Sequence, residues 1–190
     1  MYYHASQVPD IKVLEPRTSN HKKPLVYLSS KRENVLVYLS NAIEKYCKDT
    51  GFAYNGPWQK WGPYGFTEDG RLRLEEYYPN AFEETYRSVS GYIYSTSEMP
   101  KPEMDIQIKD ALATAENVPV ENVEFVEDAY EAIMDAAQKG LIELRKYEEQ
   151  SQKQLEWIER IITSEYADAT DKADYKYFLE NKFPFVLEEG

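Results

Sequence analysis

The chain has 190 residues, a length that suits one domain. Hydrophobic residues make up 42% of it and aromatic residues 14%, which is enough for a sizeable core and excludes a disordered chain. The formal net charge of −12 repels nucleic-acid backbones, and basic residues gather only around His21–Lys23 and Lys31–Arg32. This balance counts against sequence-specific DNA binding, but it leaves room for a small anionic ligand.

Cys47 is the single cysteine, so the sequence excludes an internal disulfide and a cysteine-rich zinc site. It falls in a helical stretch, where we expect a small buried apolar residue. With two histidines and one cysteine, we expect no transition-metal site. The first residues show no basic region followed by an apolar run, and no window approaches the roughly 20 apolar residues of a membrane span. We therefore expect a cytoplasmic protein with no membrane partner.

In chain order, the first elements are two strands and a helix. Residues 2–6 predict a short strand, and the apolar run 25–29 after Pro24 predicts a buried one. Ser30 and Glu33 form a capping-box pattern, and apolar residues at helical spacing continue toward Gly51. We expect one helix between Ser30 and Gly51.

The middle of the chain is rich in glycine and aromatic residues. Residues 52–80 predict hairpins or a long loop, in which Trp58 and Trp61 either line a pocket or close the edge of a core. A helical turn is expected over 81–88, a strand over 90–97, and a strand and turn over 113–126.

The last third is mostly helical. The pattern predicts helices over 127–139, 148–166 and 171–181, the first closed by Gly140, while 141–147 fits a strand or the start of the next helix. Strands that precede helices, rather than alternate with them, indicate an α+β protein. We expect a β-rich core over 1–125 and a helical extension over 126–190 that packs on it, as one domain overall.

Most familiar catalytic motifs are absent. The sequence has no glycine-rich dinucleotide fingerprint, no P-loop and no Gly-x-Ser-x-Gly elbow. Paired carboxylates carry no information in a chain with 34 acidic residues.

Three short segments do form a pattern: "YHAS" at 3–6, "VYLS" at 26–29 and "RENVLVY" at 32–38. In order, spacing and expected secondary structure they resemble the ADP-ribosyltransferase superfamily, in the His-Tyr-Glu branch of diphtheria-type toxins, poly-ADP-ribose polymerases and rifampin-modifying enzymes. The resemblance covers about a quarter of the chain, residues 2–46. It implies an ADP-ribosyltransferase-like core of two small facing β-sheets, with the helical extension attached. Ala5 departs from the family, which has glycine after the histidine.

The resemblance also implies the roles of the site residues, with NAD as the substrate. His4 would hydrogen-bond the ribose or the nicotinamide amide, assisted by Ser6, and Ser29 would lie in the same binding site. Tyr27 and Tyr38 would enclose the nicotinamide ring, which suits a flat aromatic ligand.

The third member of the triad would be a glutamate near the start of a later strand. Glu116 is the first candidate and Glu143 the second. The residues themselves leave structural roles open, because Tyr27 and Tyr38 also fit core positions and Glu116 also fits a surface.

The resulting hypothesis is a protein that binds NAD and transfers ADP-ribose to an unknown acceptor, which could be a protein, a nucleic acid or a small molecule. One alternative is a non-catalytic nucleotide-binding or partner-binding module on the same scaffold. Another is an interaction protein whose acidic helices, over 148–165 and 171–180, dock a basic partner.

Overall fold

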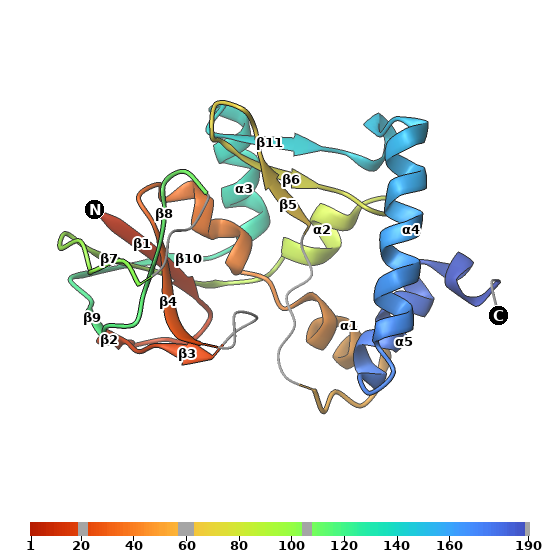
Figure 1. The fold of residues 1–190 in the computed structure, drawn as a ribbon, viewed down its shortest axis with the longest axis horizontal. Coiled ribbons are helices and arrows are strands. Elements are labelled where there is room, and N and C mark those ends of the chain that lie inside the picture. Colours follow the sequence, from red (N-terminus) through yellow and green to blue (C-terminus); the bar gives the residue numbers. More distant parts are fainter. Residues whose placement is uncertain (19–22, 57–62, 104–107, 189–190) are drawn as a thin grey trace.

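The computed structural model describes residues 1–18, 23–56, 63–103 and 108–188 (Figure 1). The chain contains both helices and strands, and its main sheet is antiparallel, which confirms an α+β protein. The strands are β1 (Tyr2–Ser6), β2 (Val13–Leu14), β3 (Arg17–Thr18), β4 (Pro24–Ser29), β5 (Tyr64–Phe66), β6 (Leu72–Glu75), β7 (Gly91–Thr96), β8 (Ala111–Thr114), β9 (Val118–Pro119), β10 (Asn122–Val126) and β11 (Ile142–Arg145). The α-helices are α1 (Ala42–Thr50), α2 (Ala81–Tyr86), α3 (Ala129–Gln138), α4 (Gln152–Asp168) and α5 (Ala173–Lys182), and the 3-10 helices are η1 (Glu33–Tyr38), η2 (Tyr147–Glu149) and η3 (Pro184–Leu187).

The strands form one main sheet and two smaller ones. The main sheet is antiparallel and has the order β10-β7-β1-β4-β3, with β8 also paired to β4. The second sheet has the order β11-β6-β5, and its strands β11 and β6 run parallel. Strands β2 and β9 form a separate pair. The middle of the main sheet is therefore β1, flanked by β7 and β4.

A central core joins the two larger sheets. It takes buried side chains from the main sheet, from the second sheet and from η1, α2 and α3. Full burial of one Leu or Ile side chain contributes about 1.5–3 kcal/mol, so this shared core holds the sheets together. Its largest fully buried members are Leu36, Leu39, Leu72, Leu74, Tyr86, Ile93 and Ile133.

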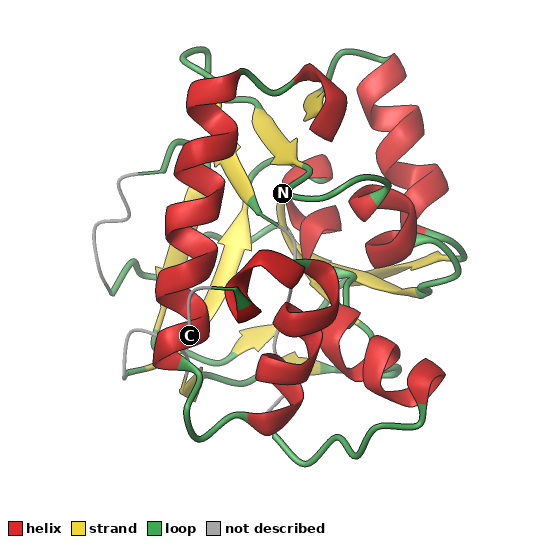
Figure 2. Cartoon of the chain, turned by 90° about the vertical axis from the view of Figure 1, so that its right-hand side faces the viewer, coloured by secondary structure: helices red, strands yellow, loops and turns green. Residues whose placement is uncertain are grey.

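A second core lies among the helices at the other end of the molecule (Figure 1). It joins α1 to α4, α5 and η3, and it buries Cys47 completely, as the sequence predicts. Figure 2 shows α4 and α5 from the side on which they cover the rest of the chain. Among the described residues, no helix combines the length and the hydrophobicity that a bilayer crossing demands.

The expected helix between Ser30 and Gly51 is wrong in one respect, because the structure divides it. The segment forms η1, leaves the helical conformation at Leu39 and starts again as α1. Four consecutive residues of η1, Asn34–Val37, are buried, which the single buried stripe of a surface α-helix does not allow. Ser30 caps neither helix. Gly51 ends α1 in the left-handed conformation, with φ of 72°, as predicted.

The expected boundary between residues 125 and 126 is not a break in the packing. Helix α3 and strand β11 follow it in the chain, yet Ile133 and Ile142 belong to the central core. Strand β11 also pairs with β6 from the first half of the chain. The C-terminal third therefore contributes a strand as well as helices.

Candidate functional site

Most of the residues that the sequence assigns to a nucleotide site lie on β1 and β4 of the main sheet. Strand β4 pairs with β8 over four residues, from Val26 to Ser29, but with β1 only where Tyr3 faces Ser29. The ladder between β1 and β4 therefore ends beside His4. Backbone groups beyond that pair need other hydrogen-bond partners.

His4 supplies one of these partners. Its Nδ1 lies 2.9 Å from the carbonyl oxygen of Tyr27, and the ring is half-buried. A carbonyl oxygen only accepts, so Nδ1 carries the proton that it donates. In the neutral form of the ring, Nε2 is then an acceptor. The bond ties the middle of β1 to the middle of β4 and fixes the orientation of the imidazole.

Tyr38 comes to the same region from η1. Its hydroxyl lies 3.2 Å from the hydroxyl of Tyr64, and the two rings meet edge to face with centroids 6.2 Å apart. Burial raises the pKa of Tyr38, and the neighbouring phenols of Tyr64 and Tyr27 raise it further. The Tyr38 phenol therefore stays neutral at physiological pH, and the structure brings Tyr27 and Tyr38 near each other. We call His4, Tyr27, Tyr38 and Tyr64 the β1–β4 site.

Tyr64 joins this site although the sequence did not single it out. It lies on β5, whose residues follow a segment rich in tyrosine and tryptophan. In a segment with so many aromatic residues, composition alone cannot identify the one that meets Tyr38. Trp58 and Trp61, which the sequence did single out, lie outside the described residues, as does His21.

The two predicted serines make local hydrogen bonds. Ser6 Oγ, at the end of β1, accepts from the backbone N–H of Val8 at 3.2 Å. Ser29 Oγ is buried and accepts from the backbone N–H of Lys31 at 3.1 Å. Both hydroxyls thus stabilise the turns that follow β1 and β4.

Glu116 lies at the far end of β4 from Ser29. Because Val26 pairs with Thr114 and the strands are antiparallel, the residues after β8 continue toward Pro24. Glu116 is exposed there, and its carboxylate accepts from the backbone N–H of Lys101 at 3.2 Å. The structure does not bring Glu116 to the β1–β4 site.

Glu143 lies on the second sheet, on the face away from Tyr38. It pairs with Arg73 across β11 and β6, and Arg73 pairs with Gly65 across β6 and β5. Paired residues project to the same face and neighbours along a strand to opposite faces, so Tyr64 lies on the other side of the sheet from Glu143. The Glu143 carboxylate accepts from Arg145 Nε at 2.9 Å.

Asp110 is a carboxylate that the sequence analysis missed. It precedes β8 at the Ser29 end of β4, in the left-handed conformation with φ of 65°. Its Oδ1 accepts from Ser30 Oγ at 3.0 Å, and its Oδ2 lies 3.3 Å from Lys31 Nζ. Burial alone would raise the pKa of Asp110, but Ser30 and Lys31 outweigh it and hold the pKa below its usual value. An isolated aspartate before a short apolar run gives no signal in so acidic a sequence.

Asn34 adds a buried polar group to η1. Its side chain is 6% exposed, and within the described part of the chain no donor reaches its Oδ1. A buried acceptor without a donor costs about 1–3 kcal/mol. Asn34 precedes Tyr38 by four residues on the same helix, so this acceptor belongs to the segment that supplies the site.

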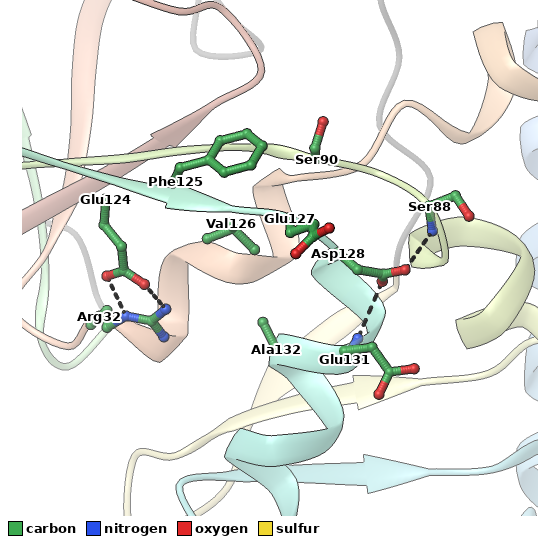
Figure 3. Close-up of a pocket in the computed structure, with 10 residues that line it drawn as sticks. All are labelled: Arg32, Ser88, Ser90, Glu124, Phe125, Val126, Glu127, Asp128, Glu131 and Ala132. Atoms are coloured by element: carbon green, nitrogen blue, oxygen red, sulfur yellow. Dashed lines mark hydrogen bonds and ion pairs between the residues drawn. The ribbon is translucent and has the colours of Figure 1, made fainter.

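A hollow of about 690 Å³ lies elsewhere, between β10 and the start of α3. Figure 3 shows Arg32 facing Glu124 at one end of it, and Asp128 joined to the backbone of Ser88 and Glu131 at the other. None of the residues that the sequence assigns to the NAD site lines it. In the described ranges, no group of three or more His, Cys, Asp and Glu residues is arranged to hold a metal ion.

Comparisons of this chain with protein-family models, with curated proteins and with solved structures found no significant match.

Proposed function

We propose that this chain binds NAD at the β1–β4 site and transfers its ADP-ribose to an acceptor. One observation supports the proposal above others: His4 Nδ1 is anchored on the Tyr27 carbonyl where the β1–β4 ladder ends, and Tyr38 lies near Tyr27. A histidine so anchored presents its ring in a fixed orientation, as a binding residue needs.

The chemistry of the site suits the nicotinamide end of NAD. A neutral phenol at Tyr38 and the ring of Tyr27 offer aromatic surfaces to a flat heteroaromatic ring. His4 Nε2, the acceptor nitrogen, suits a ribose hydroxyl.

Transfer also needs a carboxylate. The bond between ribose C1′ and the nicotinamide nitrogen breaks, its electron pair leaves with nicotinamide, and the acceptor then bonds to C1′ and loses a proton. A negative group beside C1′ stabilises the cationic sugar of the transition state. Asp110 is our candidate for this role, because its carboxylate is ionised and lies at the end of β4 where β1, β4 and β8 are paired.

The test measures NAD binding and nicotinamide release separately. We expect calorimetric titration with NAD to show saturable binding that His4→Ala and Tyr27→Ala abolish. Tyr177→Ala is the matched control, because this half-buried tyrosine stacks on Phe52 in the helical end of the molecule. Absence of binding at millimolar NAD would contradict the proposal.

A second candidate function is NAD binding without transfer. The placement of Glu116 and Glu143 away from Tyr38 favours it, because both acids that the sequence predicts for the triad make contacts elsewhere. Chromatographic measurement of released nicotinamide separates the two functions. Release that Asp110→Asn abolishes supports transfer, whereas binding with no release in the unmodified protein supports the non-catalytic module.

A further inference from the structure

Strand β10 is the outer strand of the main sheet. It pairs with β7 over its whole length, from Asn122 to Val126, and within the described ranges no strand pairs with its other side. The outer side of such a strand presents N–H and C=O groups that can pair with another chain. Proteins usually protect such edges with lysine, proline or a bulge.

The side chains of β10 provide little of that protection. Val123 and Phe125 are 48% and 57% exposed, and they project to the same face because they are two residues apart. The Phe125 ring lies 5.3 Å from the ring of Tyr92 on β7, so an aromatic surface continues inward from the edge. Glu124 projects to the opposite face, where both of its carboxylate oxygens accept from Arg32. The one charge within the strand is therefore paired with Arg32 at the surface, on the face opposite Val123 and Phe125.

The hollow described above begins at this strand. Residues 124–126 line it together with the first turn of α3, as Figure 3 shows. Its charged lining consists of four carboxylates and one guanidinium, that of Arg32. Arg32 is paired with Glu124, and Asp128 accepts backbone N–H groups. Glu127 and Glu131 are exposed acids beside the edge, and Glu131 also pairs with Arg87 Nη1 at 3.2 Å. The hollow thus adds negative charge to an open, partly apolar strand.

We propose that β10 and this hollow bind an extended, lysine- or arginine-bearing segment of a partner protein, which adds to the main sheet as a strand. Main-chain pairing along β10 would supply affinity, and the carboxylates of the hollow would select basic side chains. Charge decides between this occupant and a second copy of the chain. Two copies that each carry a net charge of −12 would bring like charges together at this edge, whereas a basic segment is complementary to it.

The proposal does not depend on NAD binding, because none of the β1–β4 site residues lines the hollow. The two can be tested in one protein. NAD binding that persists in variants of β10, and peptide binding that persists in His4→Ala, would show that the sites act separately.

The test uses the full chain and a capped heptapeptide of alternating lysine and valine carrying a fluorescent label. Fluorescence anisotropy should show saturable binding that weakens with added salt, and amide chemical-shift changes should centre on β10 and the start of α3. A glutamate–valine peptide of the same length tests charge. A lysine–valine peptide with alternate backbone nitrogens methylated tests strand pairing, because it loses the N–H donors on one edge.

Two variants test the protein side. Phe125→Ser and the double variant Glu127→Lys/Glu131→Lys should each weaken peptide binding by about tenfold or more. Trp157→Ser is the matched control for exposed aromatic surface, since Trp157 is 38% exposed on α4. Glu156→Lys/Glu159→Lys, also exposed on α4, is the control for charge. Both controls should stay within about twofold of the unmodified chain.

Three results would overturn the proposal. The first is no peptide binding at millimolar concentration. The second is equal binding of the methylated or the glutamate peptide, which would exclude strand addition or charge selection. The third is a dimer in sedimentation that Phe125→Ser dissociates, which would assign the β10 edge to a second copy of the chain.

Discussion

Asp110 and Asp128 occupy matching places in two regions of the molecule, and their surroundings differ. Each stands directly before an element, β8 for Asp110 and α3 for Asp128, and each has a pKa below its usual value. Asp128 accepts from the backbone N–H groups of Ser88, Tyr130 and Glu131, at 2.9, 2.8 and 3.2 Å.

The Asp110 carboxylate instead has side-chain partners: it accepts a hydrogen bond from Ser30 and forms an ion pair with Lys31. Backbone donors cannot leave without disrupting α3 and the turn before β7, whereas side-chain donors can rotate away. Asp128 therefore has the surroundings of a structural acid and Asp110 those of an acid that can exchange its partners for a ligand. Asp110 also holds the less favourable left-handed conformation, which is more frequent at functional positions.

The sharpest test of this difference is Asp110→Asn. We expect nicotinamide release to fall by about 100-fold, equivalent to about 2.7 kcal/mol of transition-state stabilisation, because the amide lacks the negative charge. The free energy of unfolding, measured in urea, should change by less than about 1 kcal/mol, since the lost partners are half-exposed side chains. Loss of release in Glu116→Gln or Glu143→Gln, with Asp110→Asn unaffected, would reverse the assignment.

Asp128→Ala should show the opposite pattern, with stability lost and NAD binding kept. Loss of the helix N-cap costs about 0.5–2 kcal/mol, and loss of the acceptor for Ser88 N–H adds to it, so we expect the free energy of unfolding to fall by about 2 kcal/mol. NAD binding should remain. Glu127→Ala, at the exposed neighbouring residue, is the control and should change stability by less than about 0.5 kcal/mol. Equal effects of the two substitutions would mean that the backbone contacts of Asp128 add nothing.

His4→Ala should lower both the stability of the protein and its binding of NAD. It leaves the Tyr27 carbonyl without its imidazole donor, which should lower the free energy of unfolding by about 1–2 kcal/mol, and it should abolish NAD binding. His4→Asn offers an amide N–H in place of Nδ1 and should recover part of the stability without restoring the ribose acceptor. Recovery of NAD binding in His4→Asn would show that anchoring β4, rather than contacting the ligand, is the role of His4.

The sequence predicted individual strands better than it predicted contacts between distant parts of the chain. Strands at residues 2–6 and 25–29 follow from short apolar runs with clear ends, and the structure confirms both. The break at Leu39 could not be foreseen, because Val35–Leu39 continue the apolar pattern and leave helical conformation only where tertiary packing buries them on several sides.

Contacts of the site between residues far apart in the chain are harder to predict from the sequence. Tyr38 meets Tyr64 across 26 residues, and Ser30 meets Asp110 across 80. Both contacts depend on which strands become neighbours: β8 beside β4, and β5 on the edge of the second sheet. Spacing along the chain carries no record of these pairings, so a glutamate search by local context led to Glu116 and Glu143 rather than to Asp110, the acid that we propose for the site.

The smallest expected effect is on the pH dependence of stability, and it tests Asp128 directly. The pKa of Asp128 is lowered in the folded protein although burial opposes this, because three backbone N–H groups stabilise the carboxylate. In the unfolded chain the pKa lies near 3.9, so below that pH the unfolded state binds the proton first. The resulting stabilisation is present above about pH 4 and is lost as the pH falls through the folded pKa. Urea unfolding at several pH values from 6 to 3 should therefore show a shallower loss of stability in Asp128→Asn than in the unmodified chain. A parallel loss in both proteins would mean that Asp128 titrates alike in the two states and that its backbone contacts do not favour the charged form.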